Sequence, residues 1–261
     1  MISILLLLPI CSYGQLHKES FVRVHYLTQY KNCLEKDKSN TETILDIGKT
    51  RSCFYNRLDM ERAIIADSIK RVGGDANDLM RLVGDIPSPG TQYSIYCNYP
   101  AGGQRTVTEK VFMQFHYTEQ IDELRWELTD RDTLILDYNC KSAQCEYRGR
   151  KWNVYYTLDI PISAGPWKLH GLPGLILYAV EDENIFSFSC IGIGECKAVL
   201  PEPDLSMSQK CTRKDVQAMI RESWESPEDY LKRFGISGKG YTLDGKDIVY
   251  PRRTAVFLDK E

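Results

Sequence analysis

The middle of the chain, residues 92–193, alternates apolar and polar side chains with the period of two that is typical of β-strands. The clearest stretch is 152–160, in which Trp152, Val154 and Tyr156 share one face. Short strands of this kind, separated by tight turns, predict an antiparallel meander. Because sheets twist, we expect the meander to curve into a half-barrel.

Turn residues divide this region into hairpins. Gly149 separates residues 145–148 from residues 152–157, and a polar turn at 182–184 joins two further strand-like stretches. Residues 134–138 also alternate, and we expect a strand there.

The pattern before residue 92 is less regular. Residues 20–29 have the composition of a strand, whereas residues 31–43 are polar and are expected to form a loop. Apolar residues at helical spacing follow, and we expect Asp59 and Asp75 to cap two short helices in an insert at about 59–84.

Helical spacing returns near the end of the chain, at about 212–235. Thr212 begins a capping box, and Pro227 lies at the first position of a second helix. Residues 248–258 are expected to add a final strand or tail. We therefore predict an α+β, mainly β fold in one domain spanning residues 15–261.

The N-terminus carries a long apolar run, residues 2–10, that is too short for a standard membrane-spanning helix. Small residues follow it: Ser12 and Gly14 stand at positions −3 and −1 of a signal-peptidase site before Gln15. We therefore predict that residues 1–14 are a signal peptide, and that the protein is exported to the periplasm or cell envelope. No transmembrane span is expected after cleavage.

Removal of that segment leaves eight cysteines, an even number that suits an oxidising compartment. They are Cys33, Cys53, Cys97, Cys140, Cys145, Cys190, Cys196 and Cys211. We expect disulfides that reinforce the core, with the connectivity open. Structural zinc is the alternative, but the spacings within the 140/145 and 190/196 pairs are looser than those of usual zinc knuckles.

Composition narrows the class of protein. Hydrophobic residues make up 43% of the chain and charged residues 26%, which argues against a mainly disordered chain. With a net charge of −3 and a pI near 5.9 there is no bulk basic surface, so we expect no nucleic-acid partner. The sixteen Tyr against eight Phe favour strands.

A loop rich in turn residues follows the strand at 152–160. It contains Gly165-Pro166-Trp167-Lys168-Leu169 and the hexapeptide Gly171-Leu172-Pro173-Gly174-Leu175-Ile176. We expect a type II turn at 172–175, in which Pro173 fixes the first central residue and Gly174 takes a positive φ. Gly165 and Pro166 make a second turn, so that Trp167 is held between two bends.

This string, together with Tyr147-Arg148-Gly149-Arg150-Lys151-Trp152, resembles the GLPGLI family of exported proteins, which is named after the hexapeptide and is typical of Bacteroidota such as Porphyromonas. The resemblance runs from about residue 111 to residue 190. It implies an exported, β-rich protein. The family has no established biochemical activity, so the resemblance informs location and fold more than function.

Two roles are open for the loop. In the first it closes the sheet: Gly165, Pro166, Gly171, Pro173 and Gly174 shape the turns while Trp167 and Leu172 fill the core. In the second it binds a ligand or partner. The candidate binding residues are Trp167, His170, Leu172, Arg148, Arg150 and Trp152. His170 flanks the hexapeptide, and the two arginines form a basic cluster that is either a solvated face or a site for an anion.

The sequence contains no nucleophile elbow, P-loop or H-E-x-x-H motif. We therefore expect a non-enzymatic envelope protein, without cofactor or metal, that binds a partner protein or an apolar ligand on the concave side of its curved sheet. Handling of a metal such as copper through Cys, Met and His side chains is the alternative, and an undetected hydrolase is the third hypothesis.

Overall fold

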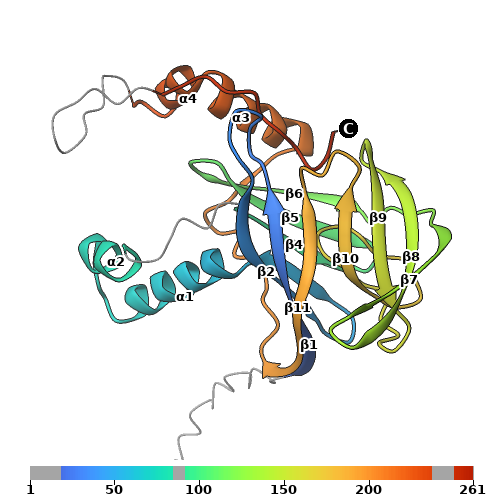
Figure 1. Ribbon diagram of the computed structural model, residues 1–261. Coiled ribbons are helices and arrows are strands. Elements are labelled where there is room, and N and C mark those ends of the chain that lie inside the picture. The colour runs from blue at the N-terminus through green and yellow to red at the C-terminus, as the bar shows by residue number, and fades with distance from the viewer. Residues whose placement is uncertain (1–18, 85–91, 237–249, 261) are drawn as a thin grey trace, which may run out of the picture.

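The computed structural model describes residues 19–84, 92–236 and 250–260, and within them two antiparallel meanders form one curved sheet (Figure 1). The first meander contains β1 (Glu19–Tyr30), β2 (Ser39–Ile47), β3 (Ser52–Asn56), β4 (Tyr93–Cys97), β5 (Gln104–Lys110) and β6 (Gln114–Gln120). The second contains β7 (Glu127–Ile135), β8 (Tyr138–Tyr147), β9 (Arg150–Thr157), β10 (Leu175–Glu181) and β11 (Ser187–Ala198).

The two meanders meet where β1 pairs with β11 along most of the length of both strands. The strand order is β12-β6-β5-β4-β3-β2-β1-β11-β10-β9-β8-β7, so β12 and β7 are free edges and the sheet is open. The short β12 (Gln209–Lys210) runs parallel to β6, which makes the sheet mixed. The predicted mainly β fold with a curved antiparallel sheet is confirmed.

In the part of the chain that the structure describes, four helices accompany the sheet: α1 (Arg57–Arg71), α2 (Ala76–Val83), α3 (Arg213–Glu225) and α4 (Pro227–Arg233). Helix α1 contacts β2 and β3, and α3 and α4 lie across one end of the curved sheet (Figure 1). The predicted cap at Asp75, which forms a capping box, the predicted capping box at Thr212 and the proline at the start of α4 are confirmed. No helix in the described residues is long and apolar enough to cross a membrane.

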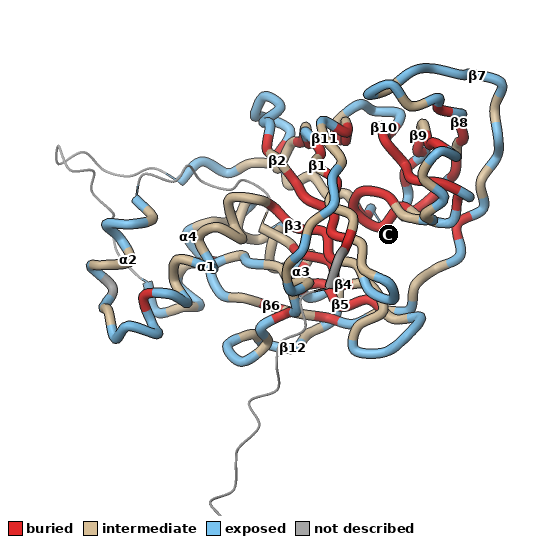
Figure 2. Tube along the Cα trace, turned by 90° about the horizontal axis from the view of Figure 1, so that it is seen from below, coloured by how far each residue is buried: buried red, intermediate tan, exposed pale blue. Residues whose placement is uncertain are grey.

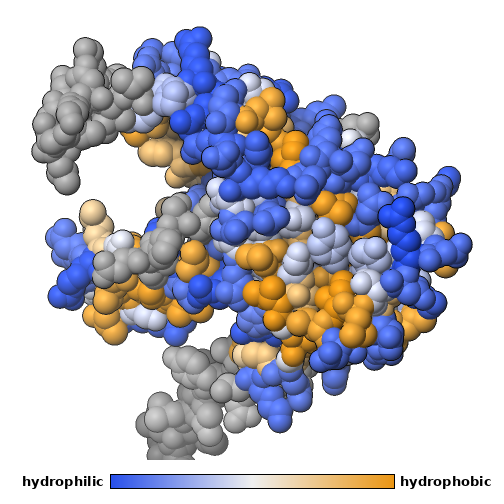
Figure 3. Space-filling model, viewed as in Figure 1, coloured by the Kyte–Doolittle hydropathy of each residue, from blue (hydrophilic) through white to orange (hydrophobic). Residues whose placement is uncertain are grey.

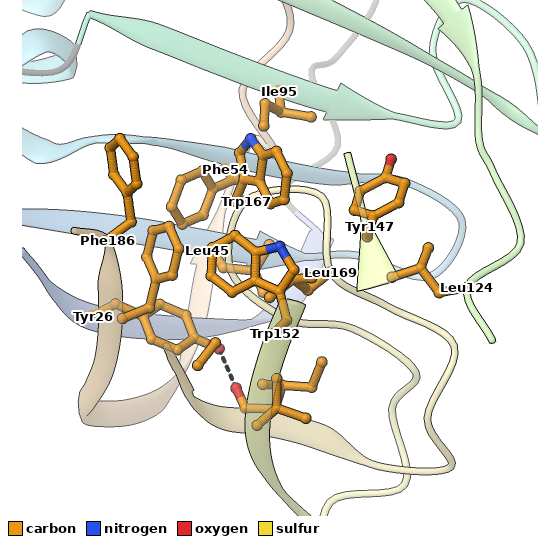
Figure 4. Close-up of a cluster of buried hydrophobic side chains, with 14 of the residues drawn as sticks. Tyr26, Leu45, Phe54, Ile95, Leu124, Tyr147, Trp152, Trp167, Leu169 and Phe186 are labelled. Carbon is orange, nitrogen blue, oxygen red and sulfur yellow. Dashed lines mark hydrogen bonds between the residues drawn. The ribbon is translucent and has the colours of Figure 1, made fainter. Parts of the chain in front are cut away.

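The core lies on the inner face of the sheet, and buried positions concentrate in the strands, whereas α2 is largely exposed (Figure 2). Its centre is aromatic. Trp152 is fully buried between Phe188 and Trp167, with ring centroids 6.1 and 5.3 Å away. The hydroxyl of Tyr26 donates a hydrogen bond of 2.7 Å to the carbonyl of Ile176, which ties β1 to β10 (Figure 4).

The outer face also carries apolar side chains. They gather over β1, β10 and β11 (Figure 3), and Leu27 and Ile191 are 36% and 50% exposed.

Three local predictions are wrong. Strand β2 begins at Ser39 inside the predicted loop 31–43, because pairing with β1 extends it. Residues 134–138 contain a turn, since Leu136 and Asp137 take positive φ between β7 and β8. Helix α1 begins after Asn56 rather than Asp59: the Asn56 side chain accepts hydrogen bonds from the backbone N–H groups of Leu58 and Asp59.

The predicted disulfides are not formed, since all eight cysteines of the described residues are free. Cys140 and Cys145 lie in one strand, where five residues at about 3.4 Å each separate their Cα atoms by about 17 Å, beyond the reach of a disulfide. Cys190 and Cys196 share β11 in the same way. The predicted signal peptide lies outside the described residues.

Candidate functional site

The loop between β9 and β10 folds into the concave side of the sheet and places Trp167, Lys168 and Leu169 in the interior. Trp167 takes a positive φ of 56° and packs its ring on Trp152 and Tyr147 (Figure 4). The loop is held to the rest of the fold by backbone hydrogen bonds, including Ile176 N–H to the Ala164 carbonyl at 3.0 Å. The loop is therefore part of the core, as expected for the first of its two predicted roles, in which it closes the sheet.

Gly174 has a role other than the predicted one. It is not among the residues with positive φ, so the expected type II turn with Gly174 in the left-handed region is wrong. A Cβ at this position would lie 1.9 Å from the Thr157 carbonyl oxygen. Glycine is needed here because two backbones touch. Gly171 is the hexapeptide glycine with positive φ, at 96°.

Beside Trp167 the interior opens into a cavity of about 810 Å³. Its walls are the inward side chains of β4, β5 and β6, the inner side of α3, and the C-terminal segment 256–259. Aromatic residues dominate the apolar part of the lining; they are Tyr30, Tyr93, Phe112, Tyr117, Trp167, Phe186, Trp224, Tyr230 and Phe257. We call this space the inner cavity.

A buried ammonium lies at the wall of the inner cavity. Lys168 Nζ is 2.8 Å from Asp259 Oδ2, 2.9 Å from Glu119 Oε1 and 3.4 Å from the Tyr117 hydroxyl. Arg213 approaches Asp259 Oδ2 at 3.6 Å. Lys168 is therefore fully engaged by its own chain, and it links the loop to β6 and to the C-terminal segment.

Three oxygen-bearing groups on the cavity wall have no such partner. No hydrogen bond or ion pair of Glu109 is present within the described chain, and neither the Tyr93 hydroxyl nor Asp259 Oδ1 has a hydrogen-bond partner there. Burial, reinforced by the negative charge of Asp259, raises the pKa of Glu109 to about 7, while Lys168 opposes the shift. Burial likewise raises the pKa of Tyr93, and Glu109 and Asp259 add to it. Glu109, Tyr93 and Asp259 are therefore close enough to affect one another's pKa values.

The two predicted arginines are engaged within the fold. Arg148 pairs with Asp122 at 2.6 Å and with Glu119 at 3.3 Å. Arg150 is buried and binds Glu181 at 2.8 Å, and its guanidinium also donates to the backbone carbonyls of residues 257 and 258. Arg150 therefore holds the C-terminal segment that forms one wall of the inner cavity.

The other four predicted binding residues lie in three different places. Trp152 and Leu172 lie within the core, and Trp167 alone of the six lines the inner cavity. His170 is half-buried outside the cavity, where burial and the positive charge of Arg105 lower its pKa. In the described residues there is no group of three or more His, Cys, Asp or Glu side chains placed to hold a metal ion, so nothing in that part supports the copper hypothesis.

Sequence reasoning missed Tyr93, Glu109 and Asp259, which come from β4, β5 and the end of the chain. One signal was present in β5, where Arg105 and Glu109 share the inward face with buried Val107. Charged residues on the apolar face of a strand indicate a buried polar site.

Comparison with known proteins gives a family-model match over a short segment and similar solved structures. A family model described as a protein of unknown function (Porph_ging) matches residues 146–178, a segment that includes β9 and the loop. No match was found among curated proteins.

Two solved structures, both of PNGF-II, are similar. The crystal forms in space groups P21 and C2 each give a TM-score of 0.49, at 15% and 16% sequence identity. They cover 79% and 78% of this chain, which spans only 34% and 33% of the PNGF-II chains.

Proposed function

We propose that this protein binds a small molecule with an apolar body and a polar head in the inner cavity, and that it does so without catalysing a reaction. The observation that carries the proposal is the combination of aromatic walls with the unpartnered Tyr93 hydroxyl and Asp259 Oδ1, beside the half-buried Glu109, which makes no hydrogen bond or ion pair in the described chain. Buried polar groups are almost always hydrogen-bonded, so a cluster of unpartnered ones around a cavity favours a bound ligand. The cavity volume of about 810 Å³ is typical of ligand sites.

We further propose that the chain is an exported member of the GLPGLI family that acts in the periplasm or cell envelope. The hexapeptide lies within the segment that the family model matches. The apolar run at residues 2–10, followed by Ser12 and Gly14, supports export.

The binding proposal is tested with the neutral dye prodan, whose fluorescence shifts when it enters an apolar site. Ser223 on α3 lines the cavity, so the larger side chain of Ser223→Trp is expected to fill part of the space. Ala218 lies on the exposed side of the same helix, so Ala218→Trp is the matched control. We expect saturable binding of one dye per chain that Ser223→Trp abolishes and Ala218→Trp leaves intact. Absence of saturable binding, or equal binding by both variants, would refute the proposal.

A further inference from the structure

We propose that the polar head of the ligand is a protonated amine, held by Glu109, Asp259 and Tyr93; this inference rests on the binding function proposed above. The three residues converge on one part of the inner cavity. Tyr93 and Glu109 are directly opposite each other on β4 and β5, so both side chains leave the sheet on its inner face. Asp259 reaches the same space from the C-terminal segment and is 8% exposed, with Oδ1 unpartnered in the described chain.

The number of acceptors matches an ammonium group. A primary ammonium carries three N–H donors and no acceptor. The Glu109 carboxylate and Asp259 Oδ1 can only accept when ionised, and the Tyr93 hydroxyl oxygen accepts as well. A carboxylate ligand would meet Arg213 Nη1, a donor without a hydrogen-bond partner in the described chain, on the same wall, but it would also face the carboxylates of Glu109 and Asp259 in a space of low dielectric, which is costly.

The protein already binds one ammonium in this manner. Lys168 Nζ is held by two carboxylates, Asp259 and Glu119, and by the hydroxyl of Tyr117. Glu109, the unpartnered second oxygen of Asp259 and the unpartnered Tyr93 hydroxyl offer the same combination of two carboxylates and one phenol. Asp259 would then bridge the lysine and the ligand, one through each carboxylate oxygen.

The charges around this part of the inner cavity also favour an ammonium group. Asp259 and Glu119 share Lys168, and Arg213 lies beside Asp259, whereas Glu109 has no ion pair in the described chain. Glu109 is half-buried, and Lys168 only partly offsets the cost of its negative charge, so its carboxyl tends to bind a proton. A ligand ammonium would supply the missing charge, and the aromatic walls would cover the rest of the molecule.

Binding of an amine is therefore linked to the ionisation of Glu109. The titratable or charged groups that act on this carboxyl come from every neighbouring element: Tyr93, Tyr117, Lys168, Cys211 and Asp259. Because the pKa of Glu109 is about 7, the carboxylate needed by an amine is scarce at pH 6 and dominant at pH 8. Amine affinity should therefore rise about tenfold between these pH values.

The test compares three probes of one shape by isothermal titration calorimetry: 2-phenylethylamine, 2-phenylethanol and 3-phenylpropionate. We expect the amine to bind most tightly at pH 8 and to weaken about tenfold at pH 6, while the alcohol shows no such gain. Glu109→Gln keeps the shape of the side chain and should reduce amine affinity roughly 10- to 100-fold. Glu146→Gln changes an exposed carboxylate on β8 and serves as the control.

The outcomes separate the inference from the function on which it rests. If prodan binds in the inner cavity but the amine has no advantage over the alcohol, the amine inference fails and the binding function stands. An amine preference that survives in Glu109→Gln also overturns the inference. Tighter binding of 3-phenylpropionate would show an anion site instead. If prodan does not bind, the proposed function itself fails.

Discussion

Replacement of Gly174 by alanine tests whether the hexapeptide loop is a packed part of the fold. The new Cβ would lie 1.9 Å from the Thr157 carbonyl oxygen and 2.7 Å from its carbonyl carbon, both of which are backbone atoms. No side-chain rotation relieves such a contact, so the backbone of β9 and the segment before β10 must move apart. Overpacking in a rigid interior costs 1–3 kcal/mol and sometimes more, and we expect about 3 kcal/mol here.

The measurement is thermal and urea unfolding followed by circular dichroism. A loss of about 3 kcal/mol corresponds to a fall in Tm of about 6–12 °C for a chain of this size. Gly194→Ala is the matched control, because a Cβ there meets nothing within 4 Å in the described structure. It should leave the free energy of unfolding within about 0.5 kcal/mol of the wild type. A Gly174→Ala protein as stable as this control would refute the packing argument.

Three further predictions follow from buried charge and from the cysteines. Arg150→Met leaves Glu181 buried without its counter-charge and frees the backbone carbonyls of the C-terminal segment. We expect the free energy of unfolding in urea to fall by about 3–5 kcal/mol and proteolysis after residue 250 to become faster. An unchanged rate of proteolysis would contradict this prediction. The pKa of Glu109 is raised in the folded state, so its contribution to stability is complete below about pH 4.5 and is lost as the pH rises through about 7. Glu109→Gln should therefore be more stable than the wild type at pH 8 and equally stable at pH 4. If the stabilities of the two proteins change in parallel with pH, the assignment is refuted. All eight described cysteines should react with iodoacetamide under denaturing conditions without reductant. In the native protein, the partly exposed Cys97, Cys196 and Cys211 should react first. A mass that corresponds to fewer than eight labels on the denatured protein would indicate disulfides.

Local signals in the sequence predicted much of the fold. The alternation correctly placed Trp152, Val154 and Tyr156 on one face of β9, which is the buried one, because a strand with one buried face must follow the period of two. The caps at Asp75 and Thr212 were also correct, since a cap depends on residues within one turn. Asn56 was missed because β3 runs directly into α1, and no loop separates the two patterns.

The site was less accessible to sequence reasoning. Trp167 was predicted as a binding residue because turn residues on both sides indicated a constrained loop, and it does line the inner cavity. Glu109 and Asp259 are far apart in the chain and meet only after the sheet curves and the C-terminal segment folds back. The purpose of Gly174 depends on the approach of Thr157, which no local pattern reveals.

The most direct test of the account is a crystal structure of the protein grown with 2-phenylethylamine at pH 8. We predict density for the ring against the aromatic wall of the inner cavity, with the nitrogen at hydrogen-bond distance, about 3 Å, from the carboxylates of Glu109 and Asp259. An inner cavity that holds only water while the amine occupies another surface would contradict it.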